Sequence, residues 1–250
     1  MRKQIAAGNW KMNTTWSDAE DLCMTVANAQ RPLDVLTILG VPSVFLQVLN
    51  EKAVEKSQFY LAAQNCHQSV SGAYTGEISA DMLRSIQIQY VILGHSERRE
   101  YFGEGNEIVY KKLLHAHETG LKPIFCCGEP LAERMAGSHK EYVLNQLQQS
   151  LLLLNVAQML DTIVAYEPIW AIGTGETASS EQAQEMHQTI RQAINDIHGS
   201  HVSEQISILY GGSVKGSNAK EIFSQNDVDG GLVGGASLNA EEFLRIIHSF

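Results

Sequence analysis

Glu167 and its neighbours have the residue types and spacing needed for acid–base chemistry. The segment 162–166 reads Thr-Ile-Val-Ala-Tyr, which is typical of a short buried strand because β-branched and aromatic residues favour strands. Pro168 ends that strand and confines the backbone of Glu167 to an extended geometry. Gly173 and Gly175 follow in a loop that can approach a ligand closely. The pattern predicts a general base beside a lid that closes over an anion; the alternative is a surface glutamate before an ordinary loop.

The charge of the chain restricts its partners. Among 250 residues, 44% are hydrophobic and 18% are charged, which is ordinary for a globular protein with a sizeable core. The formal net charge of −10 argues against nucleic acid or an anionic membrane as the main partner, because both need clustered Lys and Arg. An anionic substrate would therefore need local hydrogen-bond donors.

The cysteines and the amino terminus favour a cytoplasmic protein. Cys23, Cys66, Cys126 and Cys127 show no CxxC spacing, and an adjacent pair is too constrained for an ordinary disulfide, so we expect reduced thiols. Residues 1–10 contain too short an apolar run for a signal peptide, and no run approaches the length of a membrane span.

Short apolar runs alternate with amphipathic segments along the whole chain, which predicts repeated βα units and a parallel sheet. Strands are expected near 4–9, 35–40, 59–64, 90–93, 121–126, 161–166, 205–210 and 228–233. Helices are expected near 17–30, 43–56, 79–87, 105–119, 138–154, 179–198, 216–224 and 239–248. Entry signals for these helices are Ser17 before Asp18 and Glu20, Ser179 with Gln182, and Asn239 with Glu242.

Eight such units in this length predict an α/β fold in which one domain, 1–250, forms a (β/α)8 barrel with a closed eight-stranded parallel sheet. The competing fold is an open doubly wound sheet with a glycine fingerprint after its first strand. Residues 173–178 fit the G-x-G-x-x-A dinucleotide pattern, with Asp196 beyond them. Their context argues against a nicotinamide or flavin site, because the strand ends before Glu167 and the helix begins after Ser179.

In a closed barrel the functional residues gather at the carboxyl ends of the strands. The expected strand ends are polar or glycine-rich here: Gly8-Asn9-Trp10-Lys11-Met12-Asn13, Gly94-His95-Ser96-Glu97, Glu167, Tyr210-Gly211-Gly212-Ser213 and Gly234-Gly235. Glycines after the seventh and eighth strands can offer bare N–H groups to a phosphate, although turn chemistry alone could also explain them.

With these motifs the chain resembles the triosephosphate isomerase family, and the resemblance spans nearly its whole length. The motifs that carry it, in order, are Gly8 to Asn13, Gln64-Asn65, Gly72-Ala73-Tyr74-Thr75-Gly76-Glu77, Gly94-His95-Ser96-Glu97-Arg98-Arg99, Ala165 to Gly175, Tyr210-Gly211-Gly212-Ser213-Val214 and Leu232 to Leu238. The resemblance implies a TIM barrel that interconverts dihydroxyacetone phosphate and glyceraldehyde 3-phosphate in glycolysis and gluconeogenesis. No redox cofactor and no metal would be required.

The resemblance also assigns catalytic roles. Glu167 would move a proton between neighbouring carbons, and His95 would polarise the carbonyl as a neutral imidazole. The family attributes that neutrality to a pKa lowered by a helix N-terminus, and Ser96 and Glu97 are a plausible helix start. Lys11 would supply positive charge, and Asn9 a hydrogen bond nearby. Glu97 would pair with Lys11, although some readings of the family give it a proton-transfer role.

Phosphate binding and lid closure would use other strand ends. The resemblance implies that the backbone N–H groups of Gly173, Ser213, Gly234 and Gly235 hold the phosphate. The lid hinges would be Pro168-Ile169-Trp170 and Glu176-Thr177-Ala178, with Tyr210 and Ser213 holding the closed lid by hydrogen bonds. Glu176 stands where the family commonly has lysine. Val41 before Pro42 and Pro130 after Glu129 also depart from the family pattern, away from the proposed chemistry, and Cys126 is interpreted as packing.

The family is usually dimeric, and the loop Asn65 to Glu77 would reach into a second subunit with Thr75 near its active site. Val70, Ala73 and Tyr74 in this loop suit burial by a homodimer partner but could equally pack on their own barrel.

Two other functions stay open from the sequence. One is a different phosphate-binding barrel enzyme, such as a sugar-phosphate epimerase or lyase, which usually displays metal ligands or a Schiff-base lysine. The other is a catalytically silent homologue that acts as a binding protein, in which loss of Lys11, His95 or Glu167 would be expected.

Overall fold

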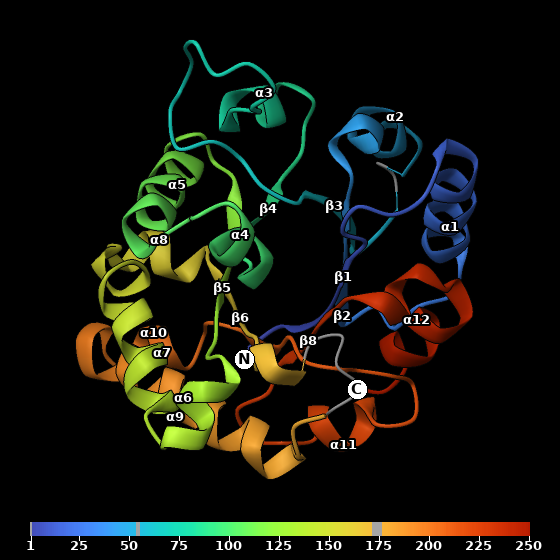
Figure 1. The fold of residues 1–250 in the computed structure, drawn as a ribbon. Coiled ribbons are helices and arrows are strands. Elements are labelled where there is room, and N and C mark those ends of the chain that lie inside the picture. Colours follow the sequence, from blue (N-terminus) through green and yellow to red (C-terminus); the bar gives the residue numbers. More distant parts are fainter. Residues whose placement is uncertain (1, 54–55, 172–176) are drawn as a thin grey trace.

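The strands form a closed barrel at the centre of the molecule (Figure 1). The structure is a computed structural model and describes residues 2–53, 56–171 and 177–250. All strand pairs are parallel and follow the order of the chain, from β1 to β8 and back to β1. The strands are β1 (Gln4–Asn9), β2 (Val35–Val41), β3 (Phe59–Ala63), β4 (Tyr90–Leu93), β5 (Lys122–Cys127), β6 (Ile163–Tyr166), β7 (Ile208–Tyr210) and β8 (Gly230–Val233). The prediction of a closed parallel (β/α)8 barrel is confirmed, and the alternative of an open sheet is wrong.

Helices surround the barrel, and each long one packs its apolar face on the strands. The α-helices are α1 (Trp16–Asn28), α2 (Ser43–Ala53), α3 (Ala80–Ser85), α4 (Ser96–Tyr101), α5 (Asn106–Glu118), α6 (Leu131–Ala136), α7 (His139–Gln148), α8 (Val156–Leu160), α9 (Ser180–His198), α10 (Ser200–Ser203), α11 (Ala219–Phe223) and α12 (Ala240–Ile247). Short 3-10 turns are η1 (Leu151–Leu153), η2 (Ile169–Ala171) and η3 (Gly235–Leu238). In the described part of the chain, no helix is both long and apolar enough to cross a bilayer.

Several helix boundaries differ from the sequence prediction. The segment 138–154 is not one helix, because α7 stops at Gln148 and η1 follows. Ser17 does not begin a helix: Thr15 precedes α1, and its hydroxyl donates to Asp18. The short helices α6, α8 and α10 are absent from the prediction, since they are too short to show a clear 3.6-residue period. Only the start of α4, at Ser96, is predicted.

Two helix starts follow the sequence signal closely. Ser179 and Gln182 form a capping box before α9, in which each side chain accepts from the other residue's N–H group. Asn239 accepts from the N–H of Glu242 before α12, but the Glu242 carboxylate turns to the N–H of Gly216 instead of closing a box. Local capping therefore fixes where α9 begins, immediately after the lid.

Two apolar clusters hold the barrel. One fills its interior, with Ile5 and Ala7 of β1 pointing inward, and the other lies between strands and helices, with Ala6 pointing outward. This alternation follows from the two-residue period of a strand. Cys126 lies in the interior cluster and is fully buried, and burial raises the pKa of its thiol, in keeping with its interpretation as packing. Because both clusters are continuous, the strand ends are held as a rigid rim.

We predict that Gly230→Ala disrupts closure of the barrel between β8 and β1. Gly230 has a φ of 137°, and a Cβ there would lie 1.9 Å from the carbonyl oxygen of Ile5. We expect the free energy of unfolding to fall by about 3 kcal/mol or more, as for other strained backbone positions. Denaturant titration measures this change.

Gly105→Ala is the matched control, because a Cβ at Gly105 meets nothing within 4 Å. Its unfolding free energy should change by about 1 kcal/mol or less. Equal stability of the Gly230→Ala variant and the wild type would contradict the argument.

Candidate active site

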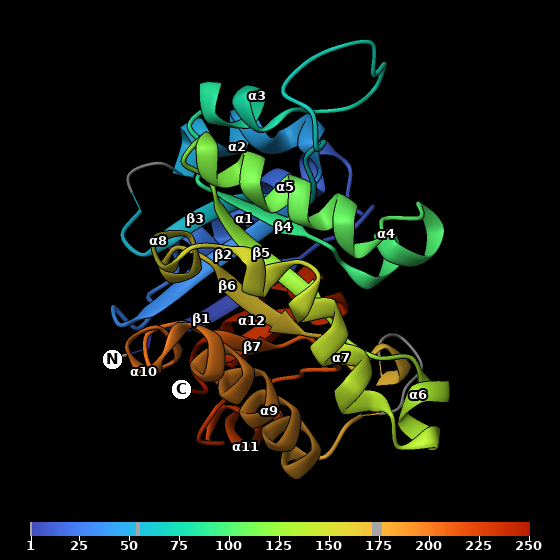
Figure 2. The ribbon, with the colours of Figure 1, turned by 90° about the vertical axis from the view of Figure 1, so that its left-hand side faces the viewer.

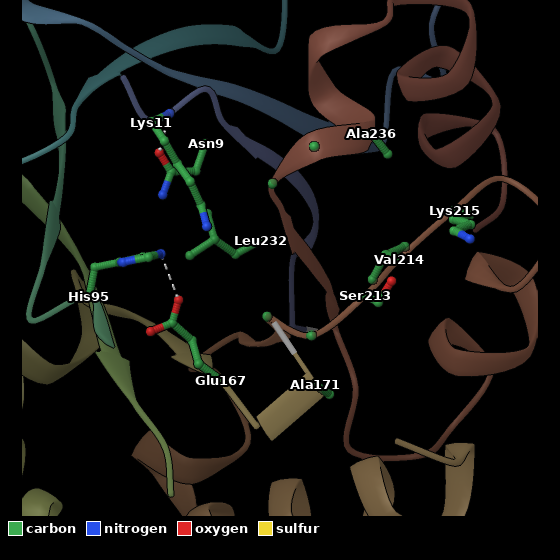
Figure 3. Close-up of a pocket in the computed structure, with 14 residues that line it drawn as sticks. Asn9, Lys11, His95, Glu167, Ala171, Ser213, Val214, Lys215, Leu232 and Ala236 are labelled. Atoms are coloured by element: carbon green, nitrogen blue, oxygen red, sulfur yellow. Dashed lines mark hydrogen bonds and ion pairs between the residues drawn. The ribbon is translucent and has the colours of Figure 1, made fainter. Parts of the chain in front are cut away.

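Glu167 lies directly after β6 and points into the mouth of the barrel (Figure 3). It is only 2% exposed, yet both carboxylate oxygens have partners. Oε1 lies 3.0 Å from Nε2 of His95, and Oε2 accepts a hydrogen bond from the N–H of Ser96 at 2.9 Å. These two partners keep the buried carboxylate ionised and fix its orientation in the cavity.

The backbone of Glu167 is held as tightly as its side chain. Its N–H donates to the carbonyl of Cys127 at 2.7 Å. A Cβ at Gly128 would lie 1.7 Å from the carbonyl oxygen of Glu167, and one at Gly211 would lie 2.9 Å from its Cγ. Only glycine fits at these two neighbours, because any side chain there would displace the glutamate.

His95 precedes α4 and caps it. Nδ1 accepts a hydrogen bond from the N–H of Glu97 at 3.2 Å, so a neutral imidazole must carry its proton on Nε2. That N–H points toward Glu167. The helix start expected at Ser96 is confirmed, and it selects the tautomer that can donate into the cavity.

The pKa of His95 differs from the sequence prediction. Burial disfavours the imidazolium and the nearby Lys11 opposes it too, but the carboxylates of Glu167 and Glu97 together outweigh them and raise the pKa of His95. Burial would raise the pKa of Glu167, but His95, the Ser96 N–H and Lys11 together lower it. The expected lowering of the pKa of His95 is therefore wrong for this arrangement, because a carboxylate lies 3.0 Å from its ring.

Lys11 enters the cavity from the loop after β1 with an unusual backbone. Its φ is 54°, a left-handed value that is rare for a residue with a side chain. Three contacts hold it: its N–H donates to Oδ1 of Asn9, its carbonyl accepts from Nε2 of Gln64, and its Nζ lies 2.6 Å from Glu97. The Glu97 carboxylate thus neutralises and orients the Lys11 ammonium.

One cavity of about 280 Å³ joins these residues to the other strand ends (Figure 3). Members of the predicted site that line it are Asn9, Lys11, His95, Glu167, Ser213, Gly234 and Gly235. Gly234 lies beside the lysine, since a Cβ there would be 3.6 Å from Cε of Lys11. An anion bound at these glycines would therefore lie beside an ammonium group.

The other described members of the predicted site do not line this cavity. Ser96 acts through its N–H on Glu167, whereas Thr75 lies in an exposed loop. Gly173 and Glu176 lie outside the described residues. Tyr210 is buried below the lid end, where burial raises its pKa to about 12 against the opposing effect of the Ala178 backbone. Thr177 and Ala178 lead into the cap of α9.

The segment predicted as the first lid hinge contacts Glu129, which the sequence analysis did not assign to the site. Residues Ile169–Ala171 form η2, and the indole of Trp170 donates to the Glu129 carboxylate at 2.9 Å. Tyr166 donates its hydroxyl to the same carboxylate, which is fully buried. Burial raises the pKa of Glu129, although these donors oppose the rise. The signal in the sequence that could have pointed to Glu129 is its position two residues beyond the buried strand β5.

The barrel and the cavity together define the class of protein. A buried base, an imidazole N–H donor and an ammonium group converge beside glycines that can bind an anion, at the rim where barrel enzymes carry their active sites. This is the arrangement of a (β/α)8-barrel isomerase or lyase that moves a proton next to a carbonyl group.

Comparison with known proteins identifies the family. A family model described as triosephosphate isomerase matches residues 4–250. Triosephosphate isomerase of Cytophaga hutchinsonii is 49% identical over 257 aligned residues, covering 100% of both chains. The enzymes of Porphyromonas gingivalis and Acetivibrio thermocellus are each 48% identical, over 100% and 98% of this chain and 100% and 97% of the relatives. The chain belongs to the triosephosphate isomerase family and is an isomerase.

We predict that Glu167→Gln lowers the pKa of His95. The substitution removes the negative charge that raises this pKa, while burial and Lys11 continue to oppose the imidazolium. NMR titration of the ring nitrogens of His95 measures the shift. In the wild type the raised pKa stabilises the fold at low pH, and this contribution is lost as pH rises through that value. An unchanged or higher pKa in the variant would contradict the electrostatic account.

Proposed function

We propose that the protein interconverts dihydroxyacetone phosphate and D-glyceraldehyde 3-phosphate through an enediolate, with Glu167 as the base. The observation that carries this proposal is the buried Glu167 carboxylate, which faces the Nε2–H of His95 at 3.0 Å inside a cavity that also holds Lys11. Proton transfer next to a carbonyl requires a base near the carbon and a hydrogen-bond donor near the carbonyl oxygen. Glu167 and His95 can fill these two roles from facing sides of the cavity.

The reaction divides between these side chains. Glu167 takes the proton from the carbon next to the carbonyl, and the electrons of that C–H bond form the double bond of the enediolate. The negative charge that develops on oxygen is stabilised by the Nε2–H of His95 and by the Lys11 ammonium. The hydroxyl oxygen on the first carbon loses its proton and the former carbonyl oxygen gains one, relayed by Nε2 of His95. Glu167 then returns its own proton to the neighbouring carbon, so the electrons only shift within the substrate and no cofactor or metal is needed.

The phosphate is bound at the opposite end of the cavity. Backbone N–H groups of Ser213, Gly234 and Gly235, and of Gly173 in the lid, hold it with help from Lys11. Local donors of this kind explain how a chain with a net charge of −10 takes an anionic substrate.

The lid keeps the enediolate from losing its phosphate to solvent. Pro168, Ile169 and Trp170 form one hinge, and Glu176, Thr177 and Ala178 form the other. Tyr210 and Ser213 hold the lid closed. Support comes from the Trp170–Glu129 contact and from the buried position of Tyr210 beside Ala178.

The protein works in glycolysis and gluconeogenesis in the cytoplasm, as one domain spanning 1–250. Glu97 orients Lys11, in line with their 2.6 Å ion pair. A silent homologue that only binds ligands is less well supported, because Lys11, His95 and Glu167 all line one cavity.

We predict that Glu167→Asp slows isomerisation by about a hundredfold or more, because retracting the carboxylate by one methylene misplaces the base by about 1 Å. A coupled assay with each triose phosphate measures the rate. In the wild type, 2-phosphoglycolate should compete with the substrate because it carries the same phosphate and a carboxylate in place of the enediolate.

Glu107→Asp is the matched control, because Glu107 is an exposed carboxylate on α5 that pairs with Lys111 and does not line the catalytic cavity. It should retain the wild-type rate. No isomerisation by the wild type, or an unchanged rate in the Glu167→Asp variant, would sink the proposal.

A homodimer completes the proposal. Residues 70–77 of the loop Asn65–Glu77 are all exposed, and both ribbon views show this loop reaching away from the barrel (Figures 1 and 2). Tyr74 is 47% and Val70 58% exposed, so the loop does not bury them on its own barrel. A second subunit would cover them, with Thr75 near its active site.

We predict a dimer at micromolar concentration by sedimentation, and a shift toward monomer in Tyr74→Asp, because the substitution buries a charge at the contact. Ile197→Asp, at a 62% exposed position on α9, is the control and should stay dimeric. A fully active wild-type monomer at that concentration would refute the homodimer.

A further inference from the structure

Gln146 of α7 makes an unusual two-point contact with the backbone of Gly128. Its Oε1 accepts from the Gly128 N–H at 2.8 Å, and its Nε2 donates to the Gly128 carbonyl at 3.2 Å. Strand β5 ends at Cys127, so Gly128 is the first residue beyond the ladder. Both hydrogen bonds are buried, and the Gln146 side chain replaces the missing neighbouring strand.

Gly128 in turn lies against the backbone of the proposed base. The space for a Cβ at Gly128 is filled by Glu167, whose carbonyl oxygen and carbon would lie 1.7 and 2.6 Å from it. The residues on either side of Gly128 bond the same segment: the Cys127 carbonyl accepts from Glu167 N–H, and the Glu129 carbonyl accepts from Ile169 N–H at 3.1 Å. The chain 127–129 therefore runs along 167–169 in close contact, and a shift of one moves the other.

No other hydrogen bond of the Gly128 N–H or carbonyl is found within residues 2–53, 56–171 and 177–250. Gln146 is 5% exposed and does not line the catalytic cavity. Within the described residues, the hydrogen bonds of its carboxamide go to Gly128, and Gly128 contacts the backbone of the base. Its carboxamide can bond both the N–H and the carbonyl of Gly128, because it presents a donor and an acceptor side by side.

We infer that Gln146 is a positioning residue for isomerisation. The two hydrogen bonds of its carboxamide, here called the clamp, hold the backbone of Gly128 in place. Gly128 in turn fixes the position of the Glu167 backbone, and so of its carboxylate in the cavity. The inference rests on the proposed role of Glu167 as the base. It predicts that loss of the clamp lowers kcat, since a base displaced by a fraction of an ångström transfers protons more slowly. The KM should change little, because the phosphate is held by other strand ends.

Gln146→Met tests the clamp, because it keeps the length of the side chain and removes both hydrogen bonds. We expect kcat to fall about tenfold or more and KM to stay within about twofold of the wild type. Gln184→Met is the matched control. Gln184 of α9 also makes a two-point contact, with the N–H and carboxylate of Asp227 before β8, away from the catalytic cavity. It should lose thermal stability but keep the wild-type kcat.

Gln146→Glu tests the same inference through the pH dependence of kcat, which a purely structural role would not change. It also replaces the Gln146→Met test if that variant fails to fold. An ionised glutamate still accepts from the Gly128 N–H but cannot donate to its carbonyl. Once protonated, it regains the donor. The kcat of this variant, divided by that of the wild type at the same pH, should therefore rise as pH falls. A ratio that stays flat or falls would overturn the inference.

The Glu167→Asp variant separates the two claims. If it isomerises at the wild-type rate, the proposed function fails and the inference fails with it. If it is slow while Gln146→Met keeps the wild-type kcat, or loses no more than Gln184→Met, the positioning role alone is wrong. In the double variant the Gln146→Met change should cost less than in the wild type, because the base is already displaced.

Discussion

The burial of the Glu167 carboxylate is the constraint on which the rest of the site depends. A charged group with 2% exposure is stable only with partners, and the structure supplies the Ser96 N–H and the His95 ring. The same partners fix its direction and keep it ionised. Burial alone would raise the pKa of Glu167, but its partners together lower it, so the group remains a carboxylate away from water. In the proposed reaction the substrate enters between Glu167 and His95 and replaces their mutual contact: its carbon faces Glu167 and its oxygen faces His95.

The closed barrel makes this arrangement possible. Residues from β1, β4, β6, β7 and β8 meet at one rim because the strands are parallel and in sequence order. Contacts with neighbouring segments then fix the exact position of Glu167. Gly128 and Gly211 leave room for the glutamate, and the contacts between 127–129 and 167–169 hold the chain on both sides of Pro168. Pro168 therefore joins Glu167 directly to the hinge proposed at Ile169 and Trp170.

Much of this could be predicted from the sequence, because local rules act within a few residues. The alternation of apolar runs and amphipathic segments predicted the barrel, and the signals at Ser179 and at Ser96-Glu97 predicted two helix starts. The remainder depends on contacts between distant segments. Gln146 meets Gly128 across the space between α7 and β5, and no local pattern marks either residue. The pKa of His95 was wrongly expected to fall, since the neighbour that raises it lies 72 residues away in the chain (167 − 95).

The central claim is that one buried carboxylate carries the proton between two carbons, and solvent exchange tests it most directly. Dihydroxyacetone phosphate is converted in D₂O, and NMR records deuterium next to the carbonyl in substrate and product. A carboxylic acid exchanges its proton with solvent between the two transfers, so the wild type should introduce deuterium and Glu167→Gln should introduce none at a comparable rate. Isomerisation by the wild type without any deuterium, or deuterium uptake by Glu167→Gln at the wild-type rate, would contradict the account.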